Sequence, residues 1–160
     1  AIRIYEAREV QPNWHARFDA TARSYEYILC ASGSPFWRNN AWMVERLPDL
    51  VKMNEAAKLL LTETDFASFC KAGSDNKTTI CKVTRAEWVM EGEVVTFHIT
   101  ADRFLRNMVR AIVGSLYEVG NGKWSVAEFN ARFAQKNRGT MGTSAPAQGL
   151  YLTEVTYNNL

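Results

Sequence analysis

Residues 83–100 read VTRAEWVMEGEVVTFHIT, and this stretch decides the class of fold. Two runs rich in β-branched and aromatic residues, 83–90 and 94–100, flank Glu91-Gly92-Glu93, which is a signal for a hairpin. Strands joined by so short a turn run antiparallel. The sheet of this protein is therefore expected to contain an antiparallel pair in the middle of the chain.

Further strands and helices are predicted on both sides of this hairpin. Alternating patterns predict strands at 2–10, at 23–30 and over GLYLTEVTY at 149–157, with a further short strand in NAWMVE at 40–45. Helices are predicted after Pro48-Asp49, from about 102 to 119, and after Ser125, which forms a capping box with Glu128. This order predicts an α+β fold, an antiparallel β-sheet with helices packed on one face. A length of 160 residues suits a single domain, 1–160.

The composition is that of an ordinary soluble protein and argues against several other classes. Hydrophobic residues make up 47% and charged residues 22%, and no apolar run is long enough to span a bilayer. The three cysteines, Cys30, Cys70 and Cys81, fit a reducing, cytoplasmic location better than a disulfide framework. Together with His15 and His98 they show no metal-ligand spacing, so no metal is expected.

The stretch ADRFLRNMVRAIVG, 101–114, places three arginines on one face of the expected helix. Arg103, Arg106 and Arg110 follow one another at spacings of three and four, opposite an apolar stripe. Ala111 and Gly114, at the edge of this face, are small enough for another backbone to approach closely. A solvated helix face normally mixes positive and negative side chains, whereas this one does not. Two interpretations remain open, a solvated surface or a site for phosphates or for a carboxylate supplied from elsewhere.

A second unusual stretch is HARFDATARSYEY, 15–27. Arg17 and Arg23 bracket a short segment, and Tyr25 shares the strand face of Arg23. An aromatic ring beside arginines suits an extruded base, which stacks on the ring while the cations take phosphates. The alternative is that Tyr25 packs in the core, as alternating strand tyrosines usually do. His15, likewise, is more often a structural hydrogen-bonding residue than a catalyst.

Four blocks taken together resemble the second half of TruA-type tRNA pseudouridine synthases. They are HARFDATARSYEYIL, TDFASF (64–69), DRFLRNMVRAIVGSLYEVG (102–120) and GLYL (149–152), in the family's order and spacing. The resemblance implies an isomerase that detaches uracil from its ribose and reattaches it through carbon, at nucleotides 38–40 of the tRNA anticodon stem-loop. It further implies a homodimer in the full-length protein, a basic cleft for the RNA, no cofactor and no membrane partner.

The same resemblance assigns roles to individual residues. Tyr25, the first tyrosine of R-x-Y-x-Y, corresponds to the active-site tyrosine that stacks on the flipped base and assists proton movement at carbon 5. Arg110 corresponds to the arginine that pairs with the catalytic aspartate, and Leu150 to an apolar residue of the uracil pocket. The residues that resemble RNA-phosphate contacts, or accompany them, are Arg17, Arg23, Arg103 and Arg106.

One part of the family pattern does not occur in these 160 residues. The catalytic aspartate of the family lies in an R-T-D-A-G-x-H block, and this chain contains no such block. Asp65 follows a threonine, but it belongs to the separate TDFASF block, so we do not assign it as the nucleophile. We therefore expect the chain to be a C-terminal fragment of an enzyme and to be inactive alone, because Tyr25 and Arg110 cannot replace a carboxylate.

Two other classes of function compete with this interpretation. A non-catalytic RNA-binding module is disfavoured because no aromatic, glycine-flanked RNP-type strand occurs. A dimerisation domain would use Met108 and Ile112 as an interface rather than as core, and the hydrodynamic size in solution would distinguish it.

Overall fold

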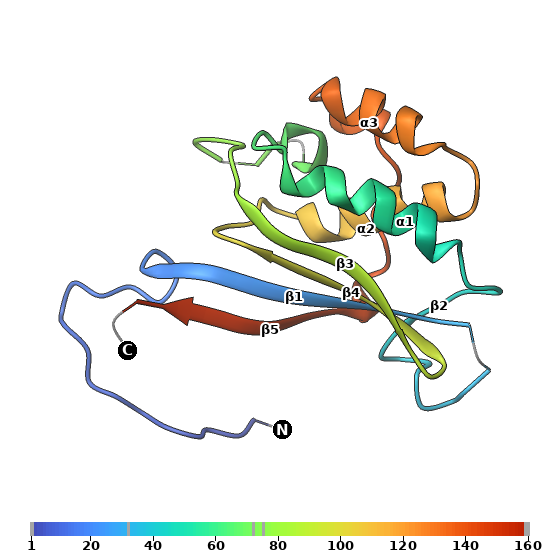
Figure 1. The fold of residues 1–160 in the computed structure, drawn as a ribbon. Coiled ribbons are helices and arrows are strands. Elements are labelled where there is room, and N and C mark those ends of the chain that lie inside the picture. The colour runs from blue at the N-terminus through green and yellow to red at the C-terminus, as the bar shows by residue number, and fades with distance from the viewer. Residues whose placement is uncertain (1, 32, 72, 75, 159–160) are drawn as a thin grey trace.

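The computed structural model describes residues 2–31, 33–71, 73–74 and 76–158 (Figure 1). Five strands form one sheet: β1 (Ala20–Cys30), β2 (Trp42–Met43), β3 (Val83–Glu91), β4 (Val94–Ala101) and β5 (Leu150–Tyr157). Three α-helices, α1 (Leu50–Lys58), α2 (Met108–Gly120) and α3 (Val126–Ala134), lie on one face of it. Short 3-10 turns occur at Leu59–Leu61, Ala67–Phe69, Arg138–Thr140 and Ala147–Gly149.

The long strand β1 organises the sheet. It pairs antiparallel with β4 on one edge and with β5 on the other, and β4 continues into the predicted hairpin with β3. The short β2 pairs parallel with the end of β1, Leu29 opposite Trp42. The predicted α+β class with helices on one face is confirmed, and the sheet is mixed rather than wholly antiparallel because of this one short pair.

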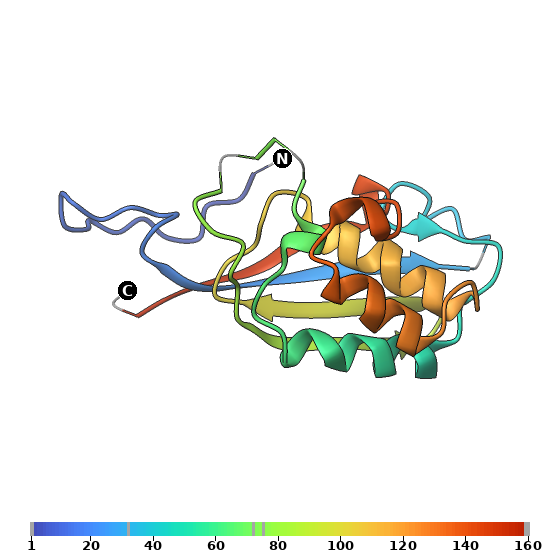
Figure 2. The same ribbon diagram turned by 90° about the horizontal axis from the view of Figure 1, so that it is seen from above.

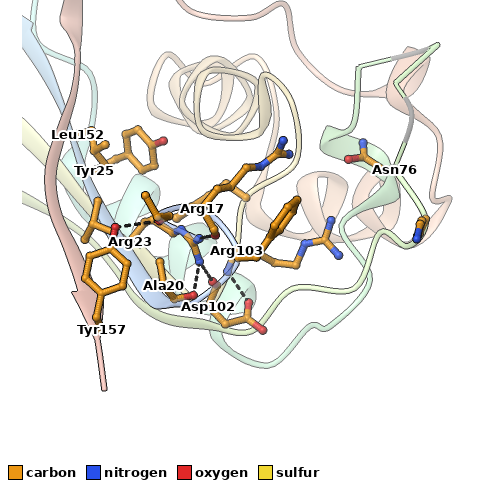
Figure 3. Close-up of a pocket in the computed structure, with 14 residues that line it drawn as sticks. Arg17, Ala20, Arg23, Tyr25, Asn76, Asp102, Arg103, Leu152 and Tyr157 are labelled. Carbon is orange, nitrogen blue, oxygen red and sulfur yellow. Dashed lines mark hydrogen bonds between the residues drawn. The ribbon is translucent and has the colours of Figure 1, made fainter. Parts of the chain in front are cut away.

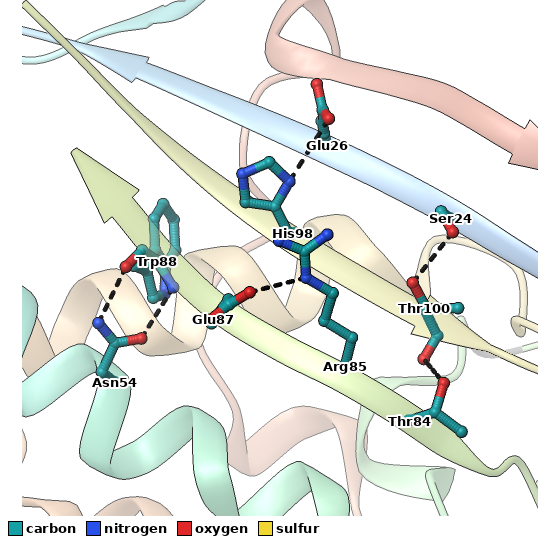
Figure 4. A network of polar contacts seen from close by, with 9 residues as sticks. All are labelled: Ser24, Glu26, Asn54, Thr84, Arg85, Glu87, Trp88, His98 and Thr100. Carbon is teal, nitrogen blue, oxygen red and sulfur yellow. Dashed lines mark hydrogen bonds and ion pairs between the residues drawn. The ribbon is translucent and has the colours of Figure 1, made fainter. Parts of the chain in front are cut away.

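The two faces of the sheet differ in polarity. Toward the helices, Tyr27, Leu29 and Phe97 are fully buried, as the alternation in β1 and β4 requires. The opposite face carries a polar network: Ser24 lies 3.0 Å from the Thr100 hydroxyl, and His98 lies 3.4 Å from the Glu26 carboxylate (Figure 4). An antiparallel sheet can expose one face to water in this way.

The TDFASF block contributes to the core beneath α3. The rings of Phe66 and Phe69 pack against Phe133, with centroids 5.5 Å and 4.9 Å apart. The buried Ser68 hydroxyl donates to the Phe133 carbonyl at 2.8 Å. The predicted capping box of Ser125 and Glu128 starts α3 and is confirmed. This block therefore fastens α3 to the body of the domain.

The helix predicted from about 102 begins six residues later, at Met108. Asn107 has φ 68°, a left-handed conformation that cannot continue a right-handed helix. Upstream, the Asp102 carboxylate accepts hydrogen bonds from the backbone amides of Lys82 and Arg103, which tie this segment to the start of β3. The prediction of one arginine face on a helix was wrong, since Arg103 and Arg106 lie in the segment before it.

The strand predicted at 2–10 is not formed among the described residues. Ile2 and Tyr5 are 96% and 84% exposed, and this segment has no paired strand beside it. A lone extended segment gains no ladder hydrogen bonds, so an alternating pattern without a partner does not fold as a strand. The following turn does pack on the domain: Trp14 lies 5.1 Å from the Tyr157 ring, and the Tyr157 hydroxyl donates to the Ala16 carbonyl.

The segment 137–148 is held against the domain by several contacts. Asn107 and Arg138 both donate to the Ser144 hydroxyl, at 2.6 Å and 3.1 Å. A Cβ on Gly114 would lie 1.8 Å from the Thr143 carbonyl oxygen, so the backbone of this segment runs directly against α2. The close approach predicted from the small residues of α2 is confirmed.

Candidate functional site

The helices leave one end of the sheet uncovered. Figure 2 shows that α1, α2 and α3 lie over the end of the sheet near the β3–β4 hairpin. The start of β1 and the end of β5 extend beyond these helices. A cleft of about 810 Å³ lies there (Figure 3). It is lined by residues 16–18, β1, the end of β5, residues 102–104 and the pair Asn76 and Lys77.

A tight turn at 15–19 presents Arg17 to this cleft. The backbone amide of His15 donates to the Asp19 carboxylate at 2.6 Å, and the amide of Arg17 donates to His15 Nδ1 at 3.1 Å. Nδ1 of His15 is therefore a hydrogen-bond acceptor inside the turn. The structural role preferred for His15 from the sequence agrees with these contacts, and Asp19 closes the same turn.

Two tyrosines of β1 lie in different environments. Tyr27 is fully buried and its hydroxyl donates to the Pro146 carbonyl at 2.7 Å. Tyr25 is half-buried, lines the cleft, and meets the Phe104 ring edge-to-face at 5.1 Å and 85°. Leu152, opposite Tyr25 on β5, is 53% exposed beside it (Figure 3). Tyr25 therefore offers a ring held by Phe104 and bordered by an apolar side chain.

Arg23 lies in the centre of Figure 3 and is engaged with the backbone. Its Nη1 donates to the carbonyls of Ala20 and Asp102 at 2.8 Å and 2.7 Å, and its Nη2 donates to the Arg17 carbonyl. The guanidinium thus joins the start of β1, the 15–19 turn and the segment after β4.

Arg110 projects from the first turn of α2. Its Nε donates to the Ala145 carbonyl at 2.6 Å, and its own carbonyl accepts from the Ala145 amide at 2.9 Å. Burial raises the pKa of the neighbouring Tyr27, and the positive charge of Arg110 opposes that rise. The predicted residues Arg106, Arg110 and Leu150 are not among those that line the cleft, whereas Arg17, Arg23, Tyr25 and Arg103 are. Leu150 pairs with Tyr27, two residues before Leu152 in β5.

Phe104 and Lys77 are among the cleft residues that were not predicted from the sequence. Phe104 was expected on a helix, and Lys77 lies in a polar loop that offered no periodic pattern. The signal that could have found Lys77 is its position between two blocks of the family resemblance. The loop returns to the domain where the Phe66 amide donates to the Thr79 carbonyl at 3.0 Å. Lys77 is thereby brought to the same cleft as Arg17 and Arg103.

The described aspartates have structural partners. Asp49 caps α1, and the backbone amide of Lys52 holds the pKa of the Asp49 carboxyl below its usual value. The Thr79 hydroxyl, 2.6 Å away, does the same for Asp65. Asp102 lines the cleft while its Oδ1 accepts from two backbone amides. Asp75 lies outside the described residues.

Among the described residues, no group of three or more His, Cys, Asp or Glu side chains could hold a metal ion. None of the described helices is both long and apolar enough to cross a membrane.

Comparison with known proteins decides the family. The sequence model described as tRNA pseudouridine synthase matches residues 56–158. The chain belongs to the tRNA pseudouridine synthase family. This membership agrees with the resemblance found in the four sequence blocks, three of which, at 15–29, 102–120 and 149–152, contribute residues to the lining of the cleft.

Several relatives of this family match almost the whole chain. The tRNA pseudouridine synthase A of Bacteroides fragilis is 50% identical over 157 residues, 98% of this chain and 62% of the relative. That of Bacteroides thetaiotaomicron is 50% identical over 159 residues, 98% of this chain and 59% of the relative. That of Bacillus pumilus is 37% identical, covering 99% of this chain and 65% of the relative. The chain therefore spans about three fifths of the length of the two Bacteroides relatives.

Proposed function

We propose that this chain forms one wall of the active site of a tRNA pseudouridine synthase, whose full-length form isomerises uridine at nucleotides 38–40 of the anticodon stem-loop. The observation that carries the proposal is the half-buried Tyr25, set edge-on against Phe104 in an open cleft beside a fully buried Tyr27. A structural tyrosine would be expected to pack as Tyr27 does. A partly exposed ring beside Leu152 instead suits a base stacked in an apolar slot.

The rim of the cleft carries the charges that RNA requires. Arg17, Arg103 and Lys77 line it, and Arg106 lies three residues beyond Arg103. Neutralised phosphates would supply most of the affinity and make it depend on salt. We assign Arg17, Arg103 and Arg106 to phosphate contacts, as the resemblance implies, and add Lys77 from its place in the cleft.

The proposed chemistry needs a carboxylate at the reacting uridine, and we infer that it comes from the R-T-D-A-G-x-H block, which does not occur in these 160 residues. Isomerisation breaks the bond from uracil N1 to C1′, forms one from C5 to C1′, and moves the C5 proton to N1. We assign the Tyr25 hydroxyl to that proton transfer, and the place of Tyr25 in the lining of the cleft supports this role. Arg110, with its Nε bound to the Ala145 carbonyl, keeps its two Nη groups for an aspartate supplied by the rest of the protein.

Several properties of the full-length protein belong to the same proposal. We infer a homodimer that acts on tRNA in the cytoplasm, without a metal or cofactor. The 160-residue chain alone is expected to have no turnover, because the R-T-D-A-G-x-H block is not in its sequence.

A complementation assay tests the proposal. The chain is incubated alone with unmodified tRNA carrying uridines at 38–40, and then with a separately expressed N-terminal half that contains the aspartate block. Pseudouridine should form only in the second reaction, and Tyr25→Ala or Arg110→Ala should abolish it. Turnover by the chain alone would mean that one of its own carboxylates reacts, and Asp102→Asn would then be the first variant to examine. Absence of turnover from a demonstrably associated pair of halves would contradict the synthase proposal.

A further inference from the structure

The cations of the cleft fall into two classes by what their side chains contact. The Arg17 guanidinium lies over the Phe18 ring at 5.6 Å, and the hydrogen bonds found for Arg17 and Arg103 as donors come from their backbone amides. Arg23 differs, because three of its N–H donors are directed to carbonyl oxygens of the protein itself.

Two of the three carbonyls lie three and six positions before Arg23, whereas the third belongs to a distant segment on the other side of the cleft. Asp102 lies 79 positions from Arg23 and begins the segment that carries Arg103 and Phe104. The carbonyl of Arg17 belongs to the 15–19 turn, and that of Ala20 to the first residue of β1. One side chain therefore holds together the pieces that present Arg17, Arg103 and the Phe104 ring.

Regular pairing of β1 with β4 ends at this point, and on its other side Asp102 is held by Lys82, whose carbonyl accepts from the Asp102 amide at 3.1 Å and whose amide donates to the Asp102 carboxylate at 2.8 Å. The last pair between the two strands is Arg23 with Ala101, immediately before Asp102. Beyond this pair, the hydrogen bond from Arg23 to the Asp102 carbonyl connects β1 to the 102–107 segment. Phe104, two residues later, is the ring against which Tyr25 is set.

We propose that Arg23 is a positioning residue of the synthase site, which fixes Phe104, Tyr25 and Arg17 through backbone carbonyls and is not itself a phosphate ligand. This inference rests on the proposed function. It replaces the phosphate contact that the family resemblance implied for Arg23. A planar guanidinium spreads its donors over three acceptors at fixed angles, whereas a lysine ammonium is a compact point charge on a flexible stem. A contact with phosphate mainly requires the positive charge of the side chain. Simultaneous hydrogen bonds to three carbonyls require the planar shape of the guanidinium.

Paired substitutions in the full-length protein separate these roles. Arg23→Lys keeps the charge and Arg23→Met removes it, and both should lower kcat/KM for tRNA at least tenfold, chiefly through kcat. Neither should change the slope of log K against log salt for RNA binding. Arg17→Met should reduce that slope by about 0.7–0.9, the contribution of one phosphate contact. Arg85→Lys, on the polar face of the sheet in an ion pair with Glu87, is the control expected to match the unaltered protein.

The opposite pattern would overturn the inference. If Arg23→Lys retains activity while Arg23→Met loses both activity and about 0.7–0.9 of the salt slope, Arg23 is a phosphate ligand.

A measurement on the unaltered chain keeps the inference testable if the Arg23 variants fail to fold. The guanidinium protons of Arg23 should exchange slowly in nuclear magnetic resonance spectra of the free chain, and they should not shift when a uridine-containing stem-loop RNA is added. Those of Arg17 should shift. A shift of the Arg23 protons equal to that of Arg17 would overturn the inference. Failure of the proposed function is seen separately, as absence of pseudouridine formation by the unaltered full-length protein, and leaves the exchange measurement valid.

Discussion

Arg110 and Ala145 are joined by two hydrogen bonds, one from the Arg110 side chain to the Ala145 carbonyl and one from the Ala145 amide to the Arg110 carbonyl. The pair links the first turn of α2 to the segment that leads into β5. The arginine that the synthase proposal reserves for a carboxylate therefore also holds its own surroundings in place. Its Nε is used for structure, which fixes the direction of the guanidinium.

This double link predicts a stability effect that does not depend on RNA. Arg110→Met leaves the Ala145 carbonyl without its side-chain donor, and Ala145 is only 1% exposed. An unsatisfied buried acceptor costs about 1–3 kcal/mol, so the free energy of unfolding should fall by that amount. Urea unfolding of the chain measures it. Arg85→Met, at a half-exposed ion pair, should change the free energy by less than about 0.5 kcal/mol. Equal effects of the two variants would contradict the structural role of Arg110.

Gly114 predicts a second stability effect, at the contact between α2 and the Thr143 backbone. A Cβ at Gly114 would lie 1.8 Å from the Thr143 carbonyl oxygen, and backbone cannot move aside as a flexible side chain can. Gly114→Ala should therefore destabilise the chain by about 1–3 kcal/mol, although alanine is the better helix former. Gly33→Ala is the control, since a Cβ there meets nothing within 4 Å. A Gly114→Ala melting temperature equal to that of Gly33→Ala would show that the segment is not packed as described.

The elements that could be predicted from the sequence are those whose cause is local. The β3–β4 hairpin has its glycine turn at Gly92, with φ 62°, and α3 has its capping box, so each is specified by residues within a few positions. The class of fold followed from these elements. The burial of the Tyr27 and Leu29 side chains on the same face of β1 followed from the alternation of side chains along a strand.

The features that could not be predicted depend on contacts between distant segments. The apolar and basic pattern of 102–107 is compatible with a helix. The left-handed Asn107 and the hydrogen bond that the Asp102 carboxylate accepts from the distant Lys82 amide prevent it. Tyr25 is the first tyrosine of R-x-Y-x-Y, but the contact of its ring with Phe104, from another segment, is not encoded in that motif. Lys77 reaches the cleft only through the closure of its loop, which no periodic pattern encodes.

Tyr25 predicts a separation between binding and turnover. Tyr25→Phe keeps the ring against Phe104, so affinity for a uridine-containing stem-loop should stay within about twofold while turnover of the full-length protein falls. Tyr25→Leu removes the ring and should weaken binding by about 1–3 kcal/mol, the usual value for one stacked base. Fluorescence anisotropy and a pseudouridine assay measure the two quantities. Unchanged turnover in Tyr25→Phe would exclude the hydroxyl from proton transfer. The stacking role of the ring would still be tested by Tyr25→Leu.

Asp65 predicts a dependence of stability on pH that distinguishes a structural aspartate from a catalytic one. The Thr79 hydroxyl at 2.6 Å, aided by the Ala67 amide, holds the pKa of Asp65 below its usual value. A carboxyl whose pKa is lowered on folding adds stability above its unfolded pKa, near 3.9, and loses it as the pH falls through the folded value. Thr79→Val removes the strongest of these interactions. It should lower the free energy of unfolding by about 1–2 kcal/mol at pH 7, and by less at pH 3.

The matched control for this prediction is Thr84→Val. The Thr84 hydroxyl donates to the Thr100 carbonyl rather than to a carboxylate, so the effect of its removal should be the same at both pH values. Urea unfolding of the three proteins at pH 7 and pH 3 provides the comparison. A Thr79→Val effect that does not shrink in acid would mean that its hydroxyl stabilises Asp65 equally in both protonation states. Asp65 would then not contribute to acid unfolding, and the conclusion that folding lowers the pKa of Asp65 would be wrong.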